Sequence, residues 1–334
     1  MLESNADLTD FVGHNVKRGV FIIAIVAITG VSIMGIEGHN QSMANGNERW
    51  MGLLQALEDK YRLLEYEVTL VVGRAESAEE VKNPKPTGQF ARSHVLLERG
   101  MQRCYFEHEY KSDETTARSI RQIAAFDGTI STQLHFMGKG HEIGDYFRPK
   151  GYIGNSSPLD APIADFALGL DIFPGFYDRG KGIAYAVQNA DEARIVEKPA
   201  GILEIHFLKG EIIAKPHRPG ILPHPEGGPC QDWKKVVLDM TRGGIITAIE
   251  EYTCFHNDPN EYTNRVLDVQ YHQTNDGDWI PLSAINALGF LSKKAVRKYE
   301  YKDVLHDHFD PESHIDRFRV EFPAGTQVLD TRGH

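Results

Sequence analysis

Hydrophobic positions along the chain recur with two different periods. Between Asn47 and Leu64, apolar residues return every three or four positions, and charged residues such as Glu58 and Lys60 fall between them. The apolar set is Trp50, Leu53, Leu54, Leu57, Tyr61 and Leu64. This spacing predicts one amphipathic helix whose apolar side packs against another part of the protein.

From Glu65 onward, apolar positions alternate with polar ones. Tyr66, Val68 and Leu70 fall on one side of an extended chain and Glu65 and Glu67 on the other, as in a half-buried strand. The same alternation predicts strands at 103–110, 121–138, 201–208, 234–254, 266–284, 296–304 and 318–330. Turn dipeptides inside these stretches predict hairpins at Asp127-Gly128, Gly243-Gly244 and Asp276-Gly277.

The order of these elements predicts the fold class. One helix is followed by consecutive hairpins, without the strand–helix–strand alternation of a parallel sheet. We therefore expect an α+β protein that is mainly antiparallel β, with residues 45–334 as a single domain. A further short helix is expected over 162–173, with Pro162 in its first turn. Because so few helices cannot cover a long apolar sheet, the sheet must either close on its own side chains or cup a ligand.

Residues 1–44 differ in character from the rest. Lys17 and Arg18 precede an apolar run, Gly19–Ile36, that contains no charged residue. The run is long for the core of a signal peptide and slightly short for a membrane span, so both interpretations stay open. Small residues with the spacing of a cleavage site follow at Ser42 and Ala44. Since flanking positive charges stay in the cytoplasm, we expect the body of the protein in the periplasm or cell envelope, anchored to the inner membrane if the run is retained.

Composition and charge narrow the range of partners. The chain has 334 residues, of which 41% are hydrophobic and 25% charged, as in ordinary globular proteins. Its formal net charge of -11 repels phosphate backbones, so nucleic acid is not an expected partner. Cys104, Cys230 and Cys254 lie far apart, and one disulfide plus one free thiol stays open.

Two segments of the predicted sheet carry a family resemblance. In "VLDVQYHQTNDGDWIPLSA" a strand leads to a turn before Trp279, Ile280 and Pro281, and "FRVEFPAGTQVLD" contains Phe-Pro-x-Gly-Thr from Phe322 to Thr326. Together with the apolar run and the amphipathic "ERWMGLLQALEDKYRLLEYEVTL", these segments resemble the periplasmic lipoprotein-carrier superfamily of LolA and LolB, in particular its large uncharacterised exported members. The resemblance covers Glu48 to Asp330.

The resemblance implies a curved half-barrel sheet whose concave side is plugged by the N-terminal amphipathic helix and the short helix. It also implies a cavity for acyl chains and no cofactor. The chain departs from the carriers in its greater length and in a Pro/Gly-rich loop at 209–233, and no carrier-specific arginine can be matched in it. The fold therefore transfers more directly than lipoprotein trafficking does.

Two histidine-rich segments are candidates for metal binding. "HRPGILPHPEGGPCQDW" contains His217, His224 and Glu226, and "DVLHDHFDPESH" contains His306 and His308. These are suitable zinc ligands, but no HExxH or paired CxxC motif fixes two of them on one face. Prolines and glycines indicate a loop in the first segment, and the second has the polarity of a strand end. A solvated connection is therefore favoured over a metal site in both.

The favoured function is a non-enzymatic exported binding protein that holds a lipid acyl chain or another apolar ligand. The expected partners are lipids or lipoproteins. The membrane is a further partner if the apolar run is not cleaved. No catalytic residue is predicted, because GxSxG, P-loop and GxGxxG motifs are missing from the sequence. Candidates for the cavity wall are Trp50, Leu54, Tyr66, Val68, Leu70, Phe106, Phe126, Phe136, Phe166, Tyr271, Trp279, Tyr299, Phe318 and Phe322. Two alternatives stay open, a metal-dependent hydrolase of the cell envelope and a structural envelope component.

Overall fold

The computed structural model describes residues 49–77, 79–111, 119–137, 149–160, 168–190, 192–213, 230–252, 264–288 and 294–332. The chain divides into two units, Met1–Ala44 and Asn45–His334, and every described residue belongs to the second. The apolar run Gly19–Ile36 and the candidate cleavage site lie outside the described residues. Within the part that is described, no helix has the length and apolar character needed to cross a bilayer.

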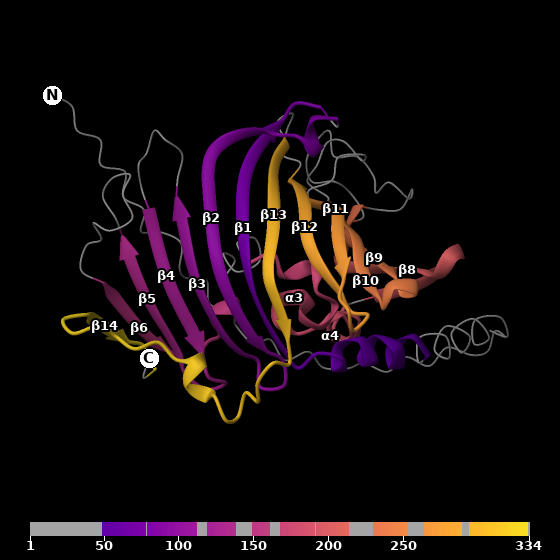
Figure 1. Cartoon of the computed structure of the whole chain (residues 1–334). Coiled ribbons are helices and arrows are strands. Elements are labelled where there is room, and N and C mark those ends of the chain that lie inside the picture. Colours follow the sequence, from indigo (N-terminus) through magenta and orange to yellow (C-terminus); the bar gives the residue numbers. More distant parts are fainter. Residues whose placement is uncertain are drawn as a thin grey trace, which may run out of the picture. The chain divides into compact units, whose positions relative to one another are not determined.

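Residues 49–59 are helical and lead into a sheet of 14 strands (Figure 1). The strands are β1 (Leu63–Ala75), β2 (Lys85–Glu98), β3 (Arg103–Lys111), β4 (Ser119–Phe126), β5 (Ser131–Met137), β6 (Lys150–Gly154), β7 (Glu192–Lys198), β8 (Ile202–Ile213), β9 (Cys230–Asp239), β10 (Ile245–Tyr252), β11 (Asn264–Gln273), β12 (Trp279–Leu288), β13 (Lys294–His306) and β14 (Gln327–Asp330). Their order in the sheet is β14-β6-β5-β4-β3-β2-β1-β13-β12-β11-β10-β9-β8-β7, so the described sheet has two edges and does not close into a barrel.

The sheet consists of two meanders that meet at its centre. Strands β1 to β6 follow one another on one side, and β7 to β13 follow one another on the other. β13 pairs antiparallel with β1, where Tyr301 lies opposite Val68 and Tyr299 opposite Leu70. Only β14 is parallel to its neighbour, β6, among the strand pairs described. The prediction of a mainly antiparallel α+β fold is confirmed.

Alternation along β1 separates two faces of the sheet. Tyr66, Val68 and Leu70 are at most 2% exposed and belong to the main hydrophobic core. Glu65 and Glu67, on either side of Tyr66 in the sequence, lie on the opposite face, because successive side chains of a strand alternate. We call the side of Tyr66 the inner face and the side of Glu65 the outer face.

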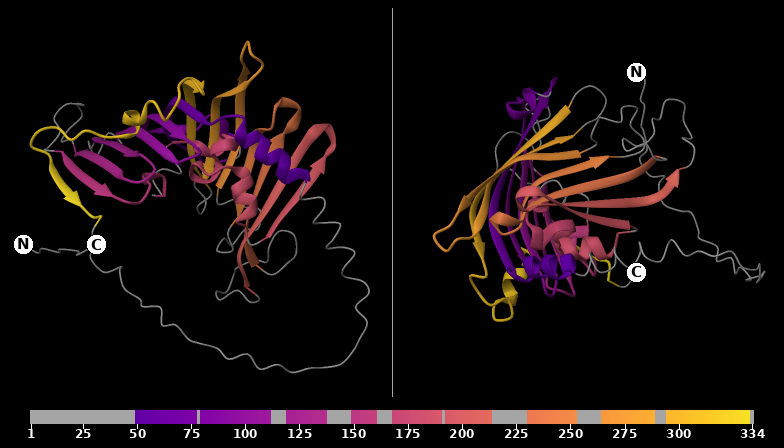
Figure 2. Two further views of the ribbon diagram at one scale, coloured as in Figure 1. Left: turned by 90° about the horizontal axis from the view of Figure 1, so that it is seen from below. Right: turned by 90° about the vertical axis from the view of Figure 1, so that its right-hand side faces the viewer.

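The inner face is covered by the chain itself. Helix 49–59 and residues 168–190, which we call the covering segment, lie on this side of the curved sheet (Figure 2). The covering segment is built of short turns, namely 3-10 helices at Leu170–Ile172 and Pro174–Phe176 and helices α3 (Tyr177–Gly180) and α4 (Ile183–Gln188). Its apolar side chains complete the main core, so the sheet and this segment form one hydrophobic unit.

The outer face is crossed by residues 307–326, the crossing segment, which leads from β13 to β14 (Figure 2). Phe318 is fully buried there, in a smaller core with Leu63 and Leu96. The backbone N–H of Val320 donates a hydrogen bond to Oγ1 of Thr132 (3.2 Å). The crossing segment thus joins the centre of the sheet to its β14 edge.

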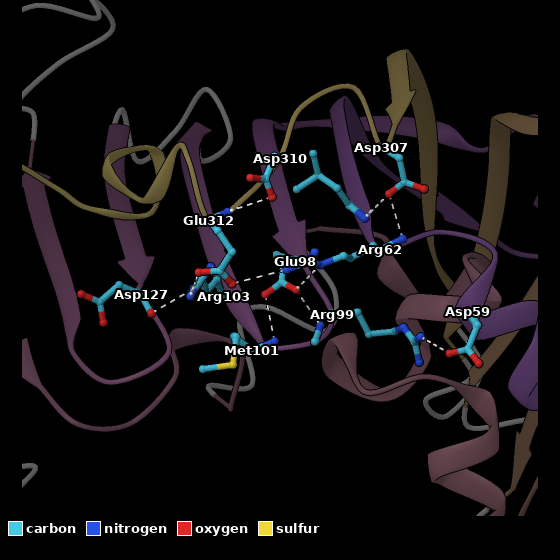
Figure 3. A network of polar contacts seen from close by, with 12 residues as sticks. Asp59, Arg62, Glu98, Arg99, Met101, Arg103, Asp127, Asp307, Asp310 and Glu312 are labelled. Atoms are coloured by element: carbon cyan, nitrogen blue, oxygen red, sulfur yellow. Dashed lines mark hydrogen bonds and ion pairs between the residues drawn. The ribbon is translucent and has the colours of Figure 1, made fainter.

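A polar network fastens the start of the crossing segment to the sheet (Figure 3). Both terminal nitrogens of Arg103 donate to the Glu312 carboxylate, each at 3.1 Å. Oδ1 of Asp307 accepts hydrogen bonds from the backbone N–H groups of Arg62 and Leu63, at 2.8 and 2.6 Å. Bidentate and charge-assisted bonds of this kind fix direction as well as contact. They hold the segment where it leaves β13.

All three predicted hairpins occur. Asp127-Gly128 joins β4 to β5, Gly243-Gly244 joins β9 to β10, and Asp276-Gly277 joins β11 to β12. At the first turn, the backbone N–H of Asp127 donates to the carbonyl of Ile130 (3.2 Å). These glycines adopt positive φ angles, from 73° at Gly243 to 95° at Gly128, which other residues rarely adopt.

Three expectations differ from the structure or fall outside it, and three strands were not expected. The strand expected over 318–330 is confined to Gln327–Asp330, because residues 315–318 form a 3-10 turn that places Phe318 in the outer core. The loop expected at 209–233 is shorter, since β8 continues to Ile213 and β9 begins at Cys230. Residues 161–167, where the Pro162 helix was expected to begin, lie outside the described residues. Strands β2, β6 and β7 carry no alternation clear enough to predict them.

Candidate functional site

The inner face of β1 and β8 to β13 is predominantly apolar. Its side chains in the main core are Tyr66, Val68, Leu70, Leu203, Ile205, Phe207, Val236, Leu238, Ile246, Ile249, Val266, Ala284, Tyr299 and Tyr301. The covering segment meets them with Leu168, Leu170, Ile172, Phe173, Phe176, Tyr177, Ile183 and Ala184. Removing this much apolar surface from water is the main favourable term in the packing of the segment.

Tyrosine hydroxyls on the sheet bind the backbone of the covering segment. Tyr66 donates to the carbonyl of Leu168 (2.8 Å), and Tyr301 donates to the carbonyl of Gly169 (3.0 Å). Irregular backbone buried against a sheet needs such partners, because its carbonyls have no regular hydrogen-bond ladder. At Gly169, an added Cβ would lie 2.5 Å from the Tyr301 hydroxyl oxygen, so the backbone approaches as closely as a glycine allows. Burial raises the pKa of both tyrosines, which keeps these hydroxyls protonated donors.

A buried carboxylate binds the covering segment to helix 49–59. Oε1 of Glu58, a residue only 2% exposed, accepts hydrogen bonds from the backbone N–H groups of Ala184 and Tyr185 at the start of α4. Its Oε2 accepts from Nη1 of Arg99 (3.2 Å). Burial raises the pKa of Glu58, whereas these bonds and the charge of Arg99 act in the opposite direction. Gly182, just before α4, has φ +99°, and a Cβ there would lie 2.2 Å from Oε1 of Glu58.

A pocket remains where the helix, the covering segment and the hairpin of β11 and β12 meet. Its apolar walls include Leu57, Ile172, Phe173, Phe176, Tyr271, Trp279 and Pro281, and its polar rim includes Lys60, Tyr61, Arg242 and His306. The cavity measures about 50 Å³. This has room for a few water molecules, whereas sites for small organic ligands measure about 300–1,000 Å³. An acyl chain therefore does not fit unless the covering segment moves.

His306 borders this pocket and stacks on Tyr61, with ring centroids 3.8 Å apart. Its Nδ1 is buried without a hydrogen-bond partner, and burial lowers the pKa of the ring to about 4. On the rim beside it, Nζ of Lys60 forms an ion pair with Asp278 at 2.6 Å. The rim therefore offers one neutral imidazole and two cations, Lys60 and Arg242, each already paired with an aspartate.

The two candidate metal ligands of this region lie in different environments. His306 borders the pocket, whereas Nε2 of His308 lies 2.6 Å from the carboxylate of Glu65 on the outer face. Among the described residues, no three His, Cys, Asp or Glu side chains are arranged to hold a metal ion. His217, His224 and Glu226 lie outside the described residues.

The remaining cavity candidates fall into four groups. Trp50, Leu54, Tyr66, Val68, Leu70, Phe106, Phe126 and Tyr299 belong to the main core or pack against it. Tyr271 and Trp279 line the pocket. Phe136 follows the inner-face residue His135 and so lies on the outer face, where Phe318 and Phe322 also pack, Phe322 against Gly151. Phe166 lies outside the described residues.

Sequence reasoning named Tyr66 as a candidate for the cavity wall but missed Tyr301 and Glu58, which also hold the covering segment. Tyr301 stands two positions after Tyr299, so the alternation of β13 could have placed both on one face. Glu58 gave no such indication, because a glutamate on a predicted helix is usually solvated. Ile172, Phe173 and Phe176 stand among prolines and glycines, where no periodic pattern marks them as buried.

Comparisons with known proteins give similar folds at low identity. No family model and no curated protein sequence matches the chain. Among solved structures, it is similar to a domain from Vibrio parahaemolyticus named for outer membrane lipoprotein sorting, with 9% identity and a TM-score of 0.39 over 80% of this chain and 96% of that one. A DUF1329 family protein from Desulfovibrio piger shows 6% identity and a TM-score of 0.34 over 81% and 98%. A beta-barrel-like DUF1849 protein from Brucella abortus shows 10% identity and a TM-score of 0.24 over 75% and 100%.

Identities of 6–10% and TM-scores of 0.24–0.39 are too low to transfer a ligand, a partner or a cellular location to this chain. What the inner face binds has to be argued from its own geometry.

Proposed function

We propose that this protein is an exported, non-enzymatic binding protein of the periplasm or cell envelope, with residues 1–44 as its export segment. Its inner face takes up a lipid acyl chain or another apolar ligand when the covering segment moves aside. The proposed location rests on Lys17 and Arg18 before the uncharged run Gly19–Ile36. The proposed ligand class rests on the apolar inner face.

One observation supports this function above the others. The covering segment occupies the inner face much as a ligand does, with apolar side chains against the wall and single hydrogen bonds from Tyr66 and Tyr301 to its carbonyls. No strand of the described sheet pairs with it, so it can leave the inner face without breaking the sheet. A ligand that buries similar apolar area can replace it at a modest net cost.

Competition between ligand and covering segment gives a test. In the variant Tyr66→Phe/Tyr301→Phe, the carbonyls of Leu168 and Gly169 lose their donors, and each lost bond is worth about 1 kcal/mol. The closed form is weakened by about 2 kcal/mol, so we expect a fluorescent fatty acid to bind at least about tenfold more tightly than to the wild type. Titration by fluorescence measures this, and mass spectrometry of gently extracted protein shows whether lipid copurifies.

Tyr105→Phe is the matched control, because Tyr105 packs on the outer face. It should leave the affinity for the fatty acid unchanged. Repeated recovery of lipid-free protein, together with no uptake by the wild type or by the double variant, would rule out the proposed function. Weaker binding by the double variant would show that the hydroxyls contact the ligand and that the segment is not displaced.

A further inference from the structure

The inner face changes character across β2 to β6. Directly opposite one another on neighbouring strands stand Ser93, His108, Gln122 and His135, in that order, and Lys150 of β6 follows opposite His135. In the next row, Gln133 of β5 lies opposite Tyr152 of β6. Opposite positions in a sheet bring side chains within contact distance. We call Ser93, His108, Gln122, Gln133, His135 and Tyr152 the polar row.

The polar row opens toward β6, next to the edge strand β14. Ser93, His108 and Gln122 are 1%, 4% and 8% exposed, whereas Gln133 and His135 are half-buried. At this end an open groove of about 390 Å³ is lined by Ser131, Gln133, Tyr152, Asn155, Ser156 and Thr331, with Ile153 and Gly154. This volume lies within the range of about 300–1,000 Å³ that small-molecule sites span.

At its open end, the residues of the polar row are joined only by long hydrogen bonds. Oε1 of Gln133 accepts from Nε2 of Gln122 at 3.4 Å and lies 3.3 Å from Nε2 of His135. Nε2 of Gln133 donates to Oγ of Ser131, also at 3.4 Å. Hydrogen bonds between such groups are usually about 2.9–3.0 Å long. These three bonds are long, so a ligand with its own donors and acceptors can replace them with better ones.

The six residues of the polar row are uncharged at neutral pH, and the cation Lys150 stands beyond them, opposite His135 and exposed to solvent. Burial lowers the pKa of His108 to about 4 and also lowers the pKa of His135. A wall that only packed against its own chain would be at least as stable with apolar side chains of the same shape. Elsewhere on the inner face, the one cation of β9, Lys234, lies 3.9 Å from Asp171 of the covering segment, so its charge is compensated. Uncharged hydrogen-bonding groups are what the polar row can recognise.

The geometry points to a headgroup site: the polar row and its groove bind the uncharged, hydroxyl-bearing head of an amphiphile whose tail lies on the apolar inner face of β1 and β8 to β13. This inference rests on the proposed function and narrows its ligand class. A ligand with an apolar tail alone makes no hydrogen bonds with the polar row. A cationic head would leave water without meeting an opposite charge there, and an anionic head would meet only Lys150, which is exposed and screened by water.

Three probes with the same tail and different heads test the assignment: n-dodecyl glucoside, dodecanoate and dodecyltrimethylammonium, each below its micelle concentration. We expect the full chain to bind the glucoside most tightly. In Gln133→Leu and in Gln122→Leu, the affinity for the glucoside should fall about five- to tenfold per variant, since each removes hydrogen bonds to the head. The affinity for dodecanoate should stay within about twofold. Gln270→Leu, at an exposed position of β11, should leave all three affinities unchanged.

A measurement on the unaltered protein guards against variants that fold poorly. The ring-proton NMR signals of His108 and His135 should shift with glucoside and not with dodecanoate. Equal affinities for the three probes, with no effect of the variants, would overturn the headgroup site and leave the proposed function standing. A preference for dodecanoate would also overturn it, in favour of a site near Lys150 or Lys234. If none of the probes binds, the proposed function fails with it.

Discussion

Buried histidines on the inner face set how the protein responds to acid. In His108, burial lowers the pKa from about 6.5 to about 4, and its Nδ1 lies 2.9 Å from Oγ of Ser93. The unfolded chain binds a proton at this residue below about pH 6.5, whereas the folded protein does so only near pH 4. The unfolded state therefore binds more protons across this window, and stability falls as the pH falls through it. Asp127 and Asp239, whose pKa values are lowered, also stabilise the fold, and they lose this contribution to stability at lower pH than His108 does.

His108→Gln should make the free energy of unfolding less dependent on pH between about 6.5 and 4. Glutamine keeps a hydrogen-bonding group beside Ser93 but does not titrate, so a loss of up to about 3 kcal/mol between pH 6.5 and 4 should disappear from the unfolding free energy. Urea unfolding at a series of pH values measures this. His272→Gln, at an exposed position on β11, should keep the wild-type pH dependence. A His108→Gln variant with the wild-type slope would show that this histidine is protonated in the fold.

At the scale of elements, the covering segment is held at defined points. Tyr66 and Tyr301 bind its first residues, and Glu58 binds its last helix, α4. Between these points the segment has no regular ladder, and its apolar side chains supply the cohesion. Elements with few hydrogen bonds of their own open at lower free energy than the strands beneath them.

Removing the Glu58 anchor should loosen α4 selectively. In Glu58→Ala, the N–H groups of Ala184 and Tyr185 are left buried without an acceptor, which should destabilise the protein by about 2–3 kcal/mol. Amide hydrogen exchange should accelerate at these two residues and stay slow in β1. Asp59→Ala, which removes an exposed partner of Arg99, is the control and should change exchange little. Unchanged protection of Ala184 in Glu58→Ala would contradict the anchor.

The strands of this fold can be predicted from the sequence more completely than the segments that pack on them. Alternation in β1 and β3 correctly separates Tyr66 and Phe106 from Glu65, because each strand has one buried face. The same alternation cannot tell which buried face is the inner one, so Phe318 was assigned to the cavity although it packs on the outer face. The covering segment has no period at all, since tertiary contacts such as those of Glu58 determine its path.

At the scale of the whole sheet unit, the crossing segment joins regions that are distant in the sheet. It is bound at one end by Asp307 and the Arg103–Glu312 pair, in its middle by Phe318, and at the other end by β14 against β6. The meander of β1 to β6 is thereby fastened on the outer face, opposite the polar row. Its rigidity matters to any ligand that would bind on the inner face there.

Phe318→Ala should show how much this fastening contributes. Phe318 is fully buried, and a truncation of this kind usually costs about 3–5 kcal/mol. We expect a lower midpoint in urea and faster proteolysis between β13 and β14. Val328→Ala, where the valine is 42% exposed, should cost little by comparison. A loss no larger than that of the control would mean that the crossing segment adds little to the stability of the sheet.

The seam between β1 and β13 has a consequence for how the chain acquires its fold. As the polypeptide emerges from its N-terminal end, β1 to β6 can assemble while β13 is still unsynthesised. One side of β1 then remains an open edge, with unmatched backbone donors and acceptors that invite wrong partners. Pairings between residues so distant in the chain also form slowly. Newly made molecules should therefore aggregate readily until β13 docks, and a chaperone that shields this edge should raise the yield of native protein.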